Sequence, residues 1–305
     1  MRSITFFSGN TRLGKFCIDH TRVWFYIEDM TCEYRDVQKI YKALETTDGA
    51  GVRILRSVGS PGLSYVDPFL LLDEFISDDP NDYIAGFPPH PHRGFETVTY
   101  MINGLMRHED SEGNRGQLGS GGIQWMTAGR GVIHSEMPLQ EAGLMHGFQL
   151  WVNLPAADKM MAPRYQNIDS TDIPVVKSAG CEVKVIAGRF NETAGPVSGI
   201  VTDPLYLDVK LNPGVDLEFP YTENHTLLAY VFEGQGRFGN TESKEIERGN
   251  IVVFSDKGSL LVKASNQGIR FLLLGAKPLN EPIFRSGPFV MNTREEIEKA
   301  YMDFR

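Results

Sequence analysis

The sequence predicts an all-β protein built from two similar barrels in tandem, and three observations support this prediction. From about Val52 onward, short apolar or alternating runs recur between clusters of Gly, Pro, Asn and Asp. The 305 residues include 31 glycines and 17 prolines, a punctuation typical of β-sandwiches and barrels rather than of α/β folds. The third observation is that the two halves of the chain repeat one pattern.

The first 29 residues differ from the rest, because they show no clear period and no glycine or proline punctuation of paired strands. A signal peptide would need a continuous apolar run, which this segment lacks, and a transit peptide should be poor in acids such as Asp19, Glu28 and Asp29. We predict a poorly ordered extension over residues 1–35. Organelle targeting by residues 1–29 is the less favoured alternative.

Two runs in the remaining chain alternate as half-buried strands do. The run GFQLWVNL, residues 147–154, places its large aliphatic side chains and Phe148 on one face, and Gln149, Trp151 and Asn153 on the other. The run LYLDVKL, residues 205–211, alternates in the same way. Each run therefore predicts a strand with one face in a core.

The repeat appears when YMINGLMRHED, from Tyr100, is aligned with YVFEGQGRFGN, from Tyr230. Each segment reads as a strand, a glycine-containing turn and an arginine-bearing return. The polar stretch RYQNIDSTDIPVV, residues 164–176, separates the halves, so we predict barrels over residues 36–170 and 171–305. The second barrel ends in a predicted helix, NTREEIEKAYMDF, capped by Asn292 or Thr293, with Glu295 and Glu296 in its first turn.

The stretch FPPHPHRGFETVTY, residues 87–100, places two histidines one residue apart. If residues 90–102 are extended, a single face carries His90, His92, Glu96, Val98, Tyr100 and Ile102, and its apolar part predicts that it points inward. His134 and Glu136, in GRGVIHSEMP, repeat the same spacing. Two adjacent strands could then gather three imidazoles and one carboxylate around a metal ion, which would satisfy groups that are costly to bury alone.

Other interpretations of the histidine pair remain open, because surface histidines or hydrogen-bonded core histidines can have the same spacing. Two such pairs in glycine-flanked strands favour the metal. The second half serves as an internal control, since the counterparts of His90 and His92 are Pro220 and Thr222. The region matching His134 and Glu136 is the apolar run GSLLVKA, so we expect a metal site in the first barrel alone.

The chain resembles the pirin family, in the bicupin branch of the cupin superfamily. The motifs that carry this resemblance span about residues 50–305: DPFLLLDEF (67–75), FPPHPHRGFETVTY (87–100), GGIQWMTAGRGVIHSEMP (121–138), GFQLWVNLP (147–155) and GPFVMNT (287–293). The resemblance implies two cupin barrels (double-stranded β-helices) packed face to face, with iron in the first. It also implies the ligands His90, His92, His134 and Glu136, with Glu96 beside the ligands rather than among them.

Three histidines and one carboxylate leave two positions open on an octahedral metal. Such ligation suits Fe(II), with other divalent transition metals possible. The resemblance implies quercetin 2,3-dioxygenase activity on a flavonol-like small molecule and dioxygen, in which Glu136 could also relay a proton from the substrate hydroxyl. One alternative is a non-catalytic, iron-dependent, redox-sensing co-regulator that acts through transcription-factor partners. A second is a barrel whose metal is only structural.

Composition limits the partners and the compartment. The formal net charge is −9 and the 30 basic residues are scattered, which disfavours direct nucleic-acid binding. No stretch approaches the ~18 consecutive apolar residues of a membrane span. Cys17, Cys32 and Cys181 are odd in number and form no CxxC pair, as expected for reduced thiols. The cysteines therefore indicate the cytoplasm, the nucleus or both, and we expect a monomer.

Overall fold

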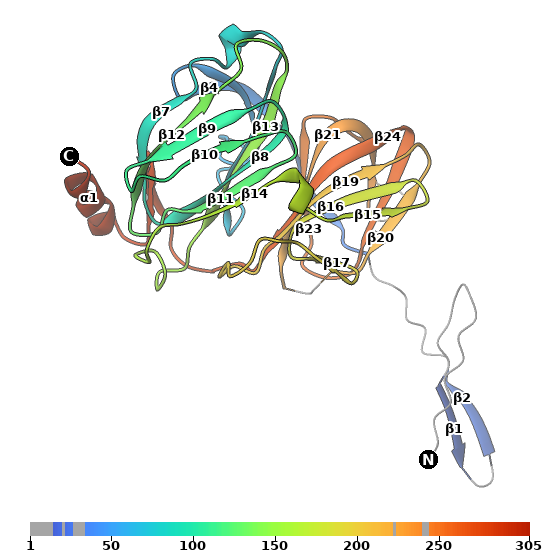
Figure 1. The fold of residues 1–305 in the computed structure, drawn as a ribbon. Helices are drawn as coiled ribbons and strands as arrows, with labels where there is room; N and C mark the ends of the chain where they lie inside the picture. Colours follow the sequence, from blue (N-terminus) through green and yellow to red (C-terminus); the bar gives the residue numbers. More distant parts are fainter. Residues whose placement is uncertain (1–14, 20–21, 27–33, 222–223, 240–243) are drawn as a thin grey trace.

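Two β-barrels lie side by side in the computed structural model, which describes residues 15–19, 22–26, 34–221, 224–239 and 244–305 (Figure 1). One helix, α1 (Arg294–Asp303), lies near the C-terminus, and Figure 1 shows it against the first barrel rather than the second. The predicted all-β architecture of two barrels and a C-terminal helix is confirmed. Within the described part of the chain, no helix is long and apolar enough to cross a membrane.

The first barrel consists of two antiparallel sheets. A seven-stranded sheet has the order β14-β11-β8-β13-β6-β5-β4, and a four-stranded sheet has the order β10-β9-β12-β7. The strands are β4 (Leu44–Asp48), β5 (Val52–Arg56), β6 (Phe69–Ser77), β7 (Phe87–His92), β8 (Phe95–Asn103), β9 (Met106–Asp110), β10 (Arg115–Leu118), β11 (Ile123–Thr127), β12 (Val132–Pro138), β13 (Met145–Asn153) and β14 (Arg164–Ile168). Side chains from both sheets, including Phe75, Met101, Met106 and Met145, form a core between them.

The second barrel is one nine-stranded sheet that bends around its own core. Its strands are β3 (Val37–Lys42), β15 (Val175–Ser178), β16 (Cys181–Ala187), β19 (Leu205–Leu211), β20 (Asp216–Phe219), β21 (Thr226–Phe238), β22 (Ile246–Glu247), β23 (Asn250–Phe254) and β24 (Leu260–Ala276). The long strands β21 and β24 pair along most of their length, with register shifts at Val231/Glu233 and Gly234/Gly236 where the ladder bends. Strand β3 pairs with β23, so residues 37–42 add an edge to this second sheet.

Three short hairpins and two 3-10 turns complete the described structure. The hairpins pair β1 (Lys15–Asp19) with β2 (Arg22–Tyr26), β17 (Arg189–Phe190) with β18 (Thr193–Ala194), and β25 (Phe284–Ser286) with β26 (Phe289–Met291); the turns are Pro80–Asp82 and Ser170–Asp172. Most of the predicted extension over residues 1–35 lies outside the described residues. The β1–β2 hairpin within it was not anticipated, and the predicted domain limits stay predictions.

The two barrels share a large apolar core at their interface. It contains Tyr100, Phe148 and Leu150 from the first barrel, and Tyr206 and Leu272 from the second. Two tyrosine hydroxyls cross this interface: Tyr100 Oη donates to Asp208 Oδ2 at 2.7 Å, and Tyr230 Oη donates to Glu74 Oε2 at 2.7 Å. Burying apolar surface is the main source of stability here, and the hydrogen bonds satisfy carboxylates that would be costly to bury alone.

The predicted continuous face over residues 90–102 is wrong. Strand β7 ends at His92 and β8 begins at Phe95, with Gly94 in the turn at φ 88°. After the turn, the residues that alternate toward each face of the strand are no longer those that the sequence numbering from His90 and His92 predicts. Val98 and Tyr100 therefore belong to the core between the barrels, whereas Met101 lies in the core of the first barrel.

The last segment of the chain leaves the second barrel after β24 and returns to the first. Helix α1 begins with a capping box in which Thr293 and Glu296 each bond the backbone of the other, so Thr293 is the cap of the two residues that the sequence offered. Ile297 and Ala300 pack on β26, and the Arg93 guanidinium forms an ion pair with Asp303 at 2.8 Å. Arg93 directly follows His92, so the end of the chain is fixed beside the histidine strand.

Candidate metal centre

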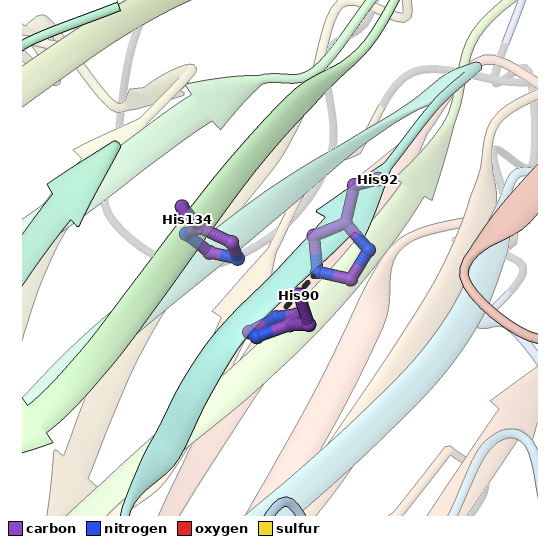
Figure 2. Close-up of side chains that lie close together, drawn as sticks. All are labelled: His90, His92 and His134. Carbon is purple, nitrogen blue, oxygen red and sulfur yellow. Dashed lines mark hydrogen bonds between the residues drawn. The ribbon is translucent and has the colours of Figure 1, made fainter. Parts of the chain in front are cut away.

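Three histidines converge inside the first barrel. His90 and His92 lie on β7 and His134 lies on β12, which pairs with β7 so that His134 is opposite His90. One ligand nitrogen from each ring lies within 4.8 Å of the others. Figure 2 shows the three rings pointing toward a common point. The structure thus brings together the three histidines singled out in the sequence, while their role as ligands stays a prediction.

The hydrogen bonds of these rings leave nitrogen lone pairs available. His90 Nδ1 lies 2.8 Å from the Pro88 carbonyl oxygen, which can only accept, so Nδ1 carries the proton and Nε2 carries a lone pair. His90 Nε2 lies 3.0 Å from His92 Nε2. Both ring nitrogens of His134 are buried, and neither has a hydrogen-bond partner among the described residues. A metal ion would satisfy this otherwise costly burial, so the residues fit a metal.

Burial keeps two of these imidazoles neutral. It lowers the pKa of His92 well below the usual range, and the neighbouring His90 lowers it further. Burial likewise lowers the pKa of His134 well below the usual range, with His92 and His90 acting in the same direction. Neutral imidazole is the form that binds metals, so these rings need not lose a proton first.

Glu136 lies beside the histidine cluster, in the same cavity. Its Oε1 accepts a hydrogen bond from Thr99 Oγ1 at 2.6 Å, and its Oε2 accepts one from Gln149 Nε2 at 2.9 Å. The register of β12 on β7 shifts between His134 and Glu136, because Glu136 lies opposite Phe87 while His134 lies opposite His90, which leaves one extra residue on β7. Burial raises the pKa of Glu136, whereas Thr99, His90 and Gln149 oppose the rise.

Glu96 does not lie beside these groups, so its predicted place next to the ligands is wrong. It shares the face of β8 that carries Val98 and Tyr100, away from the face that carries Thr99. Its Oε1 accepts a hydrogen bond from Thr127 Oγ1 at 2.6 Å. Burial raises the pKa of Glu96 to about 7. The turn at Gly94 is the physical reason for the error, because it breaks the alternation that linked Glu96 to His92.

A cavity of about 660 Å³ begins at His90, His92 and Glu136. Apolar and aromatic side chains form much of its wall: Ile54, Leu71, Phe75, Phe87 and Trp151. Polar groups lie among them: Asp48, Asp73, Gln149 and Arg285. A cavity of this size with apolar walls and a few polar groups is typical of small-molecule sites. The arrangement can hold an aromatic molecule with one end at the histidines.

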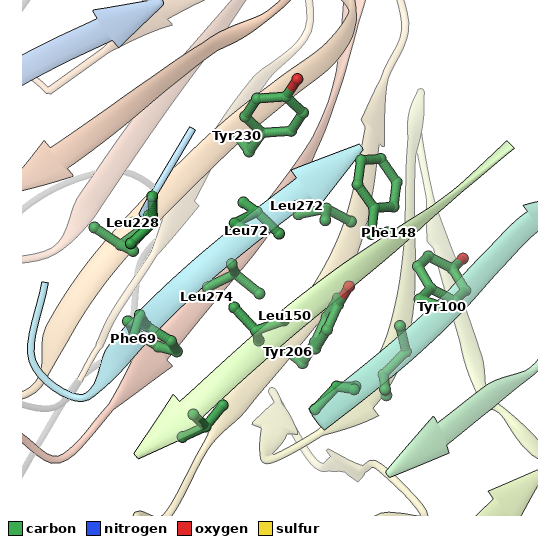
Figure 3. Close-up of a cluster of buried hydrophobic side chains, with 14 of the residues drawn as sticks. Phe69, Leu72, Tyr100, Phe148, Leu150, Tyr206, Leu228, Tyr230, Leu272 and Leu274 are labelled. Atoms are coloured by element: carbon green, nitrogen blue, oxygen red, sulfur yellow. The ribbon is translucent and has the colours of Figure 1, made fainter. Parts of the chain in front are cut away.

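Some of these wall residues could be predicted from the sequence, and others could not. Gln149 and Trp151 were assigned to the second face of the strand GFQLWVNL, and that face lines the cavity. The first face packs against the second barrel, as Figure 3 shows for Phe148 and Leu150 near Tyr206. Asp73 and Arg285 were missed. Asp73 stands within the motif DPFLLLDEF, but Arg285 follows His134 by 151 residues and no local pattern marks it.

Comparison with known proteins identifies both barrels. A family model described as Pirin matches residues 51–152, and one described as Pirin C-terminal cupin domain matches residues 206–305. A Pseudomonas aeruginosa protein named "Putative quercetin 2,3-dioxygenase" is 49% identical over 277 residues, covering 89% of this chain and 97% of its own. Human pirin is 43% identical over 266 residues, covering 86% and 89%. A crystal structure of quercetin 2,3-dioxygenase from Acinetobacter baumannii has a TM-score of 0.82 at 34% identity, covering 89% of this chain and 96% of that one.

Proposed function

The chain belongs to the pirin family, and from this membership we propose that it is a metal-dependent dioxygenase that cleaves flavonols such as quercetin. The observation that carries the proposal is the buried ring of His134, whose nitrogens have no hydrogen-bond partner among the described residues. This ring lies against His90 and His92, which line a cavity large enough for an aromatic molecule. Relatives named for quercetin 2,3-dioxygenase activity support the reaction type.

We assign His90, His92, His134 and Glu136 as the ligands of one divalent ion, with Fe(II) as the metal. Nitrogen and oxygen donors with open positions suit iron, and other divalent transition metals bind similar sites. Such an ion, when bound, supplies a Lewis acid at the substrate oxygens and redox chemistry toward dioxygen. Each Glu136 oxygen has two lone pairs, so this carboxylate can keep its bonds to Thr99 and Gln149 while it binds a metal.

The protein side chains have three tasks in this proposal. The histidines and Glu136 fix the oxygen-bearing end of the flavonol, and Phe75, Phe87 and Trp151 hold its rings and exclude water. Glu136 accepts the proton of a flavonol hydroxyl placed between it and the histidines, because burial makes its carboxylate a stronger base. Thr99 and Gln149 keep the carboxylate oriented toward that hydroxyl.

The alternative function, an iron-dependent co-regulator in the nucleus, requires a docking surface for a protein partner rather than an open cavity. The cavity at the histidines is the observation that favours the enzyme. The co-regulator would use the same metal ligands, so this alternative stays open if the iron-loaded protein does not cleave quercetin.

Activity of the iron-loaded protein tests the proposal. Quercetin and dioxygen are added to the wild type, to His92→Ala and to His225→Ala, and the loss of flavonol absorbance is followed with the iron content. His225 is a matched control, because it lies in the second barrel and bonds Tyr221 instead of the cluster. We expect turnover in the wild type and in the control, and none in His92→Ala. If the iron-loaded wild type does not turn over quercetin, this result would contradict the proposed dioxygenase activity and favour the co-regulator.

A further inference from the structure

One wall of the cavity comes from the far end of the chain. Arg285, Gly287 and Pro288 line it, although they belong to the region that matches the second family model. The rest of the lining lies between residues 48 and 151, in the first barrel. The two halves of the chain therefore build this cavity together.

The segment that carries these residues is firmly attached to the first barrel. Val290 N donates to the Arg93 carbonyl at 3.0 Å, and Arg93 N donates to the Pro288 carbonyl at 3.3 Å. The buried Lys159 Nζ donates to the Val290 carbonyl at 3.0 Å, and Asp303 pairs with the Arg93 side chain. Because Arg93 directly follows His92, these bonds hold the segment that carries Arg285 beside the end of the histidine strand.

Arg285 is exposed at the cavity and only partly bonded to protein. Its Nη1 donates to the Leu70 carbonyl at 3.1 Å, and its Cζ lies 4.7 Å from the centre of the Trp151 ring. The other two guanidinium nitrogens have no hydrogen-bond partner in the described parts of the chain. The Trp151 ring in turn lies 5.1 Å from the His92 ring. Only the Trp151 side chain thus separates Arg285 from His92, and the N–H groups of two guanidinium nitrogens can donate to a ligand.

The formal charges around Arg285 cancel. Asp73 accepts two hydrogen bonds from Arg56, at 2.8 and 2.6 Å, and Arg56 also pairs with Asp48 at 2.6 Å. Asp48 and Asp73 line the cavity with Arg285. Two arginines and two aspartates leave no net charge to attract an anion, and a ligand carboxylate would meet the two aspartates. A neutral oxygen that accepts a hydrogen bond meets no such repulsion.

We propose that Arg285 is the specificity-determining residue of the cavity: it selects a neutral hydroxylated ring at the end of the substrate that lies away from the histidines. A ring without hydroxyls leaves the guanidinium donors without an acceptor, and a ring with a carboxylate meets the aspartates. The inference rests on the proposed function, since it assumes that the other end of the molecule binds at the metal centre. It adds a selection that the metal ligands themselves cannot make.

Anaerobic binding tests the proposal, because it measures recognition without requiring turnover. The iron-loaded protein is titrated by calorimetry with three flavonols. The first is quercetin, the second lacks the hydroxyls of the ring that would lie away from the histidines, and the third carries a carboxylate on that ring. The proteins are the wild type, Arg285→Gln, Arg285→Lys and the control Arg294→Gln. Arg294 is a matched control, because it lies in the same segment and, among the described residues, pairs with Glu298 alone, on the exposed face of α1.

The wild type and Arg294→Gln should bind quercetin about tenfold more tightly than either other flavonol, as one hydrogen bond to a charged donor allows. Arg285→Gln should lose this preference, and Arg285→Lys, which keeps the charge but not the planar fork, should retain part of it. Unchanged iron content and melting temperature show that a variant is folded. A preference that survives in Arg285→Gln, or a carboxylate that binds most tightly, overturns the inference. Wild type that binds none of the three flavonols contradicts the proposed function instead.

Discussion

The hydrogen bond from Thr99 to Glu136 is a single contact that should control turnover. It is short, at 2.6 Å, and it orients a carboxylate that we assign both as a ligand and as a proton acceptor. Thr99→Val removes the hydroxyl while keeping the shape of the side chain, so we expect turnover to fall about tenfold, as the loss of a charge-assisted hydrogen bond allows. Thr99→Ser keeps the hydroxyl and should restore most of the activity. Equal rates for Thr99→Val and Thr99→Ser would contradict this role.

Glu96 should make stability depend on pH. Its folded pKa of about 7 lies above the ordinary value near 4.5, so its protonated form is favoured in the folded protein. This contribution is fully present below about pH 4.5 and is lost as the pH rises through about 7. Glu96→Gln keeps an acceptor for Thr127 and cannot ionise. It should therefore be more stable than the wild type at pH 8, by ~3 kcal/mol at most, and gain less at pH 5.

Thermal unfolding of both proteins at pH 5 and pH 8 measures this difference. The same gap between the two melting temperatures at both pH values would mean that Glu96 does not titrate in this range.

Candidate ligand residues could be predicted from the sequence where pairs of them recur at the same short spacing. His90, His92, His134 and Glu136 could be singled out because two pairs with one spacing stand in glycine-flanked strands. Thr99 and Gln149 could not be assigned to Glu136, since threonine and glutamine are common on strands. Their contact with Glu136 depends on the pairing of β8 with β13 in one sheet and on the position of β12 in the other sheet. Arg285 could not be found at all, because nothing in its local sequence refers to the cavity.

The turn between β7 and β8 is the element that decides which side chains face the metal centre. It contains Gly94, whose φ of 88° is in the left-handed region, and a Cβ there would overlap the Val290 carbonyl oxygen. The glycine is therefore required by close packing as well as by its backbone conformation. It lets the C-terminal segment approach the end of the histidine strand.

Gly94→Ala should destabilise the protein and weaken metal binding, and Gly113→Ala is its matched control. Gly113 has the same φ of 88°, but no atom lies within 4 Å of a Cβ placed there. The control should cost only the backbone strain, about 1–2 kcal/mol, whereas Gly94→Ala adds the displacement of β26 from the turn. Melting temperatures and iron affinities of the two variants check this. Similar losses in both would show that packing against Val290 is unimportant.

At the level of elements, the alternation of GFQLWVNL predicted β13 and both of its faces, and the capping residues predicted α1. The single face predicted over residues 90–102 is interrupted at a glycine. A left-handed turn there exchanges the faces toward which the odd and even residues of the following strand point. An alternating sequence defines which side chains share a face only as long as the strand is unbroken.

Two tyrosines allow the barrel interface to be tested with a matched pair of variants. Tyr100 Oη donates to Asp208 across the interface, whereas Tyr206 Oη is buried and has no partner within the described residues. Tyr100→Phe should lower stability by about 1–2 kcal/mol, because a buried carboxylate loses one of its donors. Tyr206→Phe should leave stability unchanged or raise it, since it removes an unsatisfied hydroxyl. Chemical denaturation of both variants makes the comparison, and an equal loss in both would contradict it.

For the whole molecule, the repeat in the sequence predicted two barrels, and the absence of histidines at the matching positions of the second half pointed to the first barrel as the metal site. The return of the C-terminal segment was not predictable. Arg93 and Asp303 are 210 residues apart, and a contact between them leaves no periodic trace in either half. The segment nevertheless supplies part of the cavity wall and holds the end of the histidine strand.

The most direct test of the central claim is anaerobic calorimetric titration with Fe(II) of the wild type, His134→Ala and His225→Ala. His134 has no hydrogen bond to lose among the described residues, so its removal should affect metal binding more than folding. We expect one ion per chain in the wild type and in His225→Ala, and an affinity roughly 100-fold lower in His134→Ala. Equal affinity in His134→Ala, or no iron bound by the wild type, would contradict the assignment of this cluster as a metal centre.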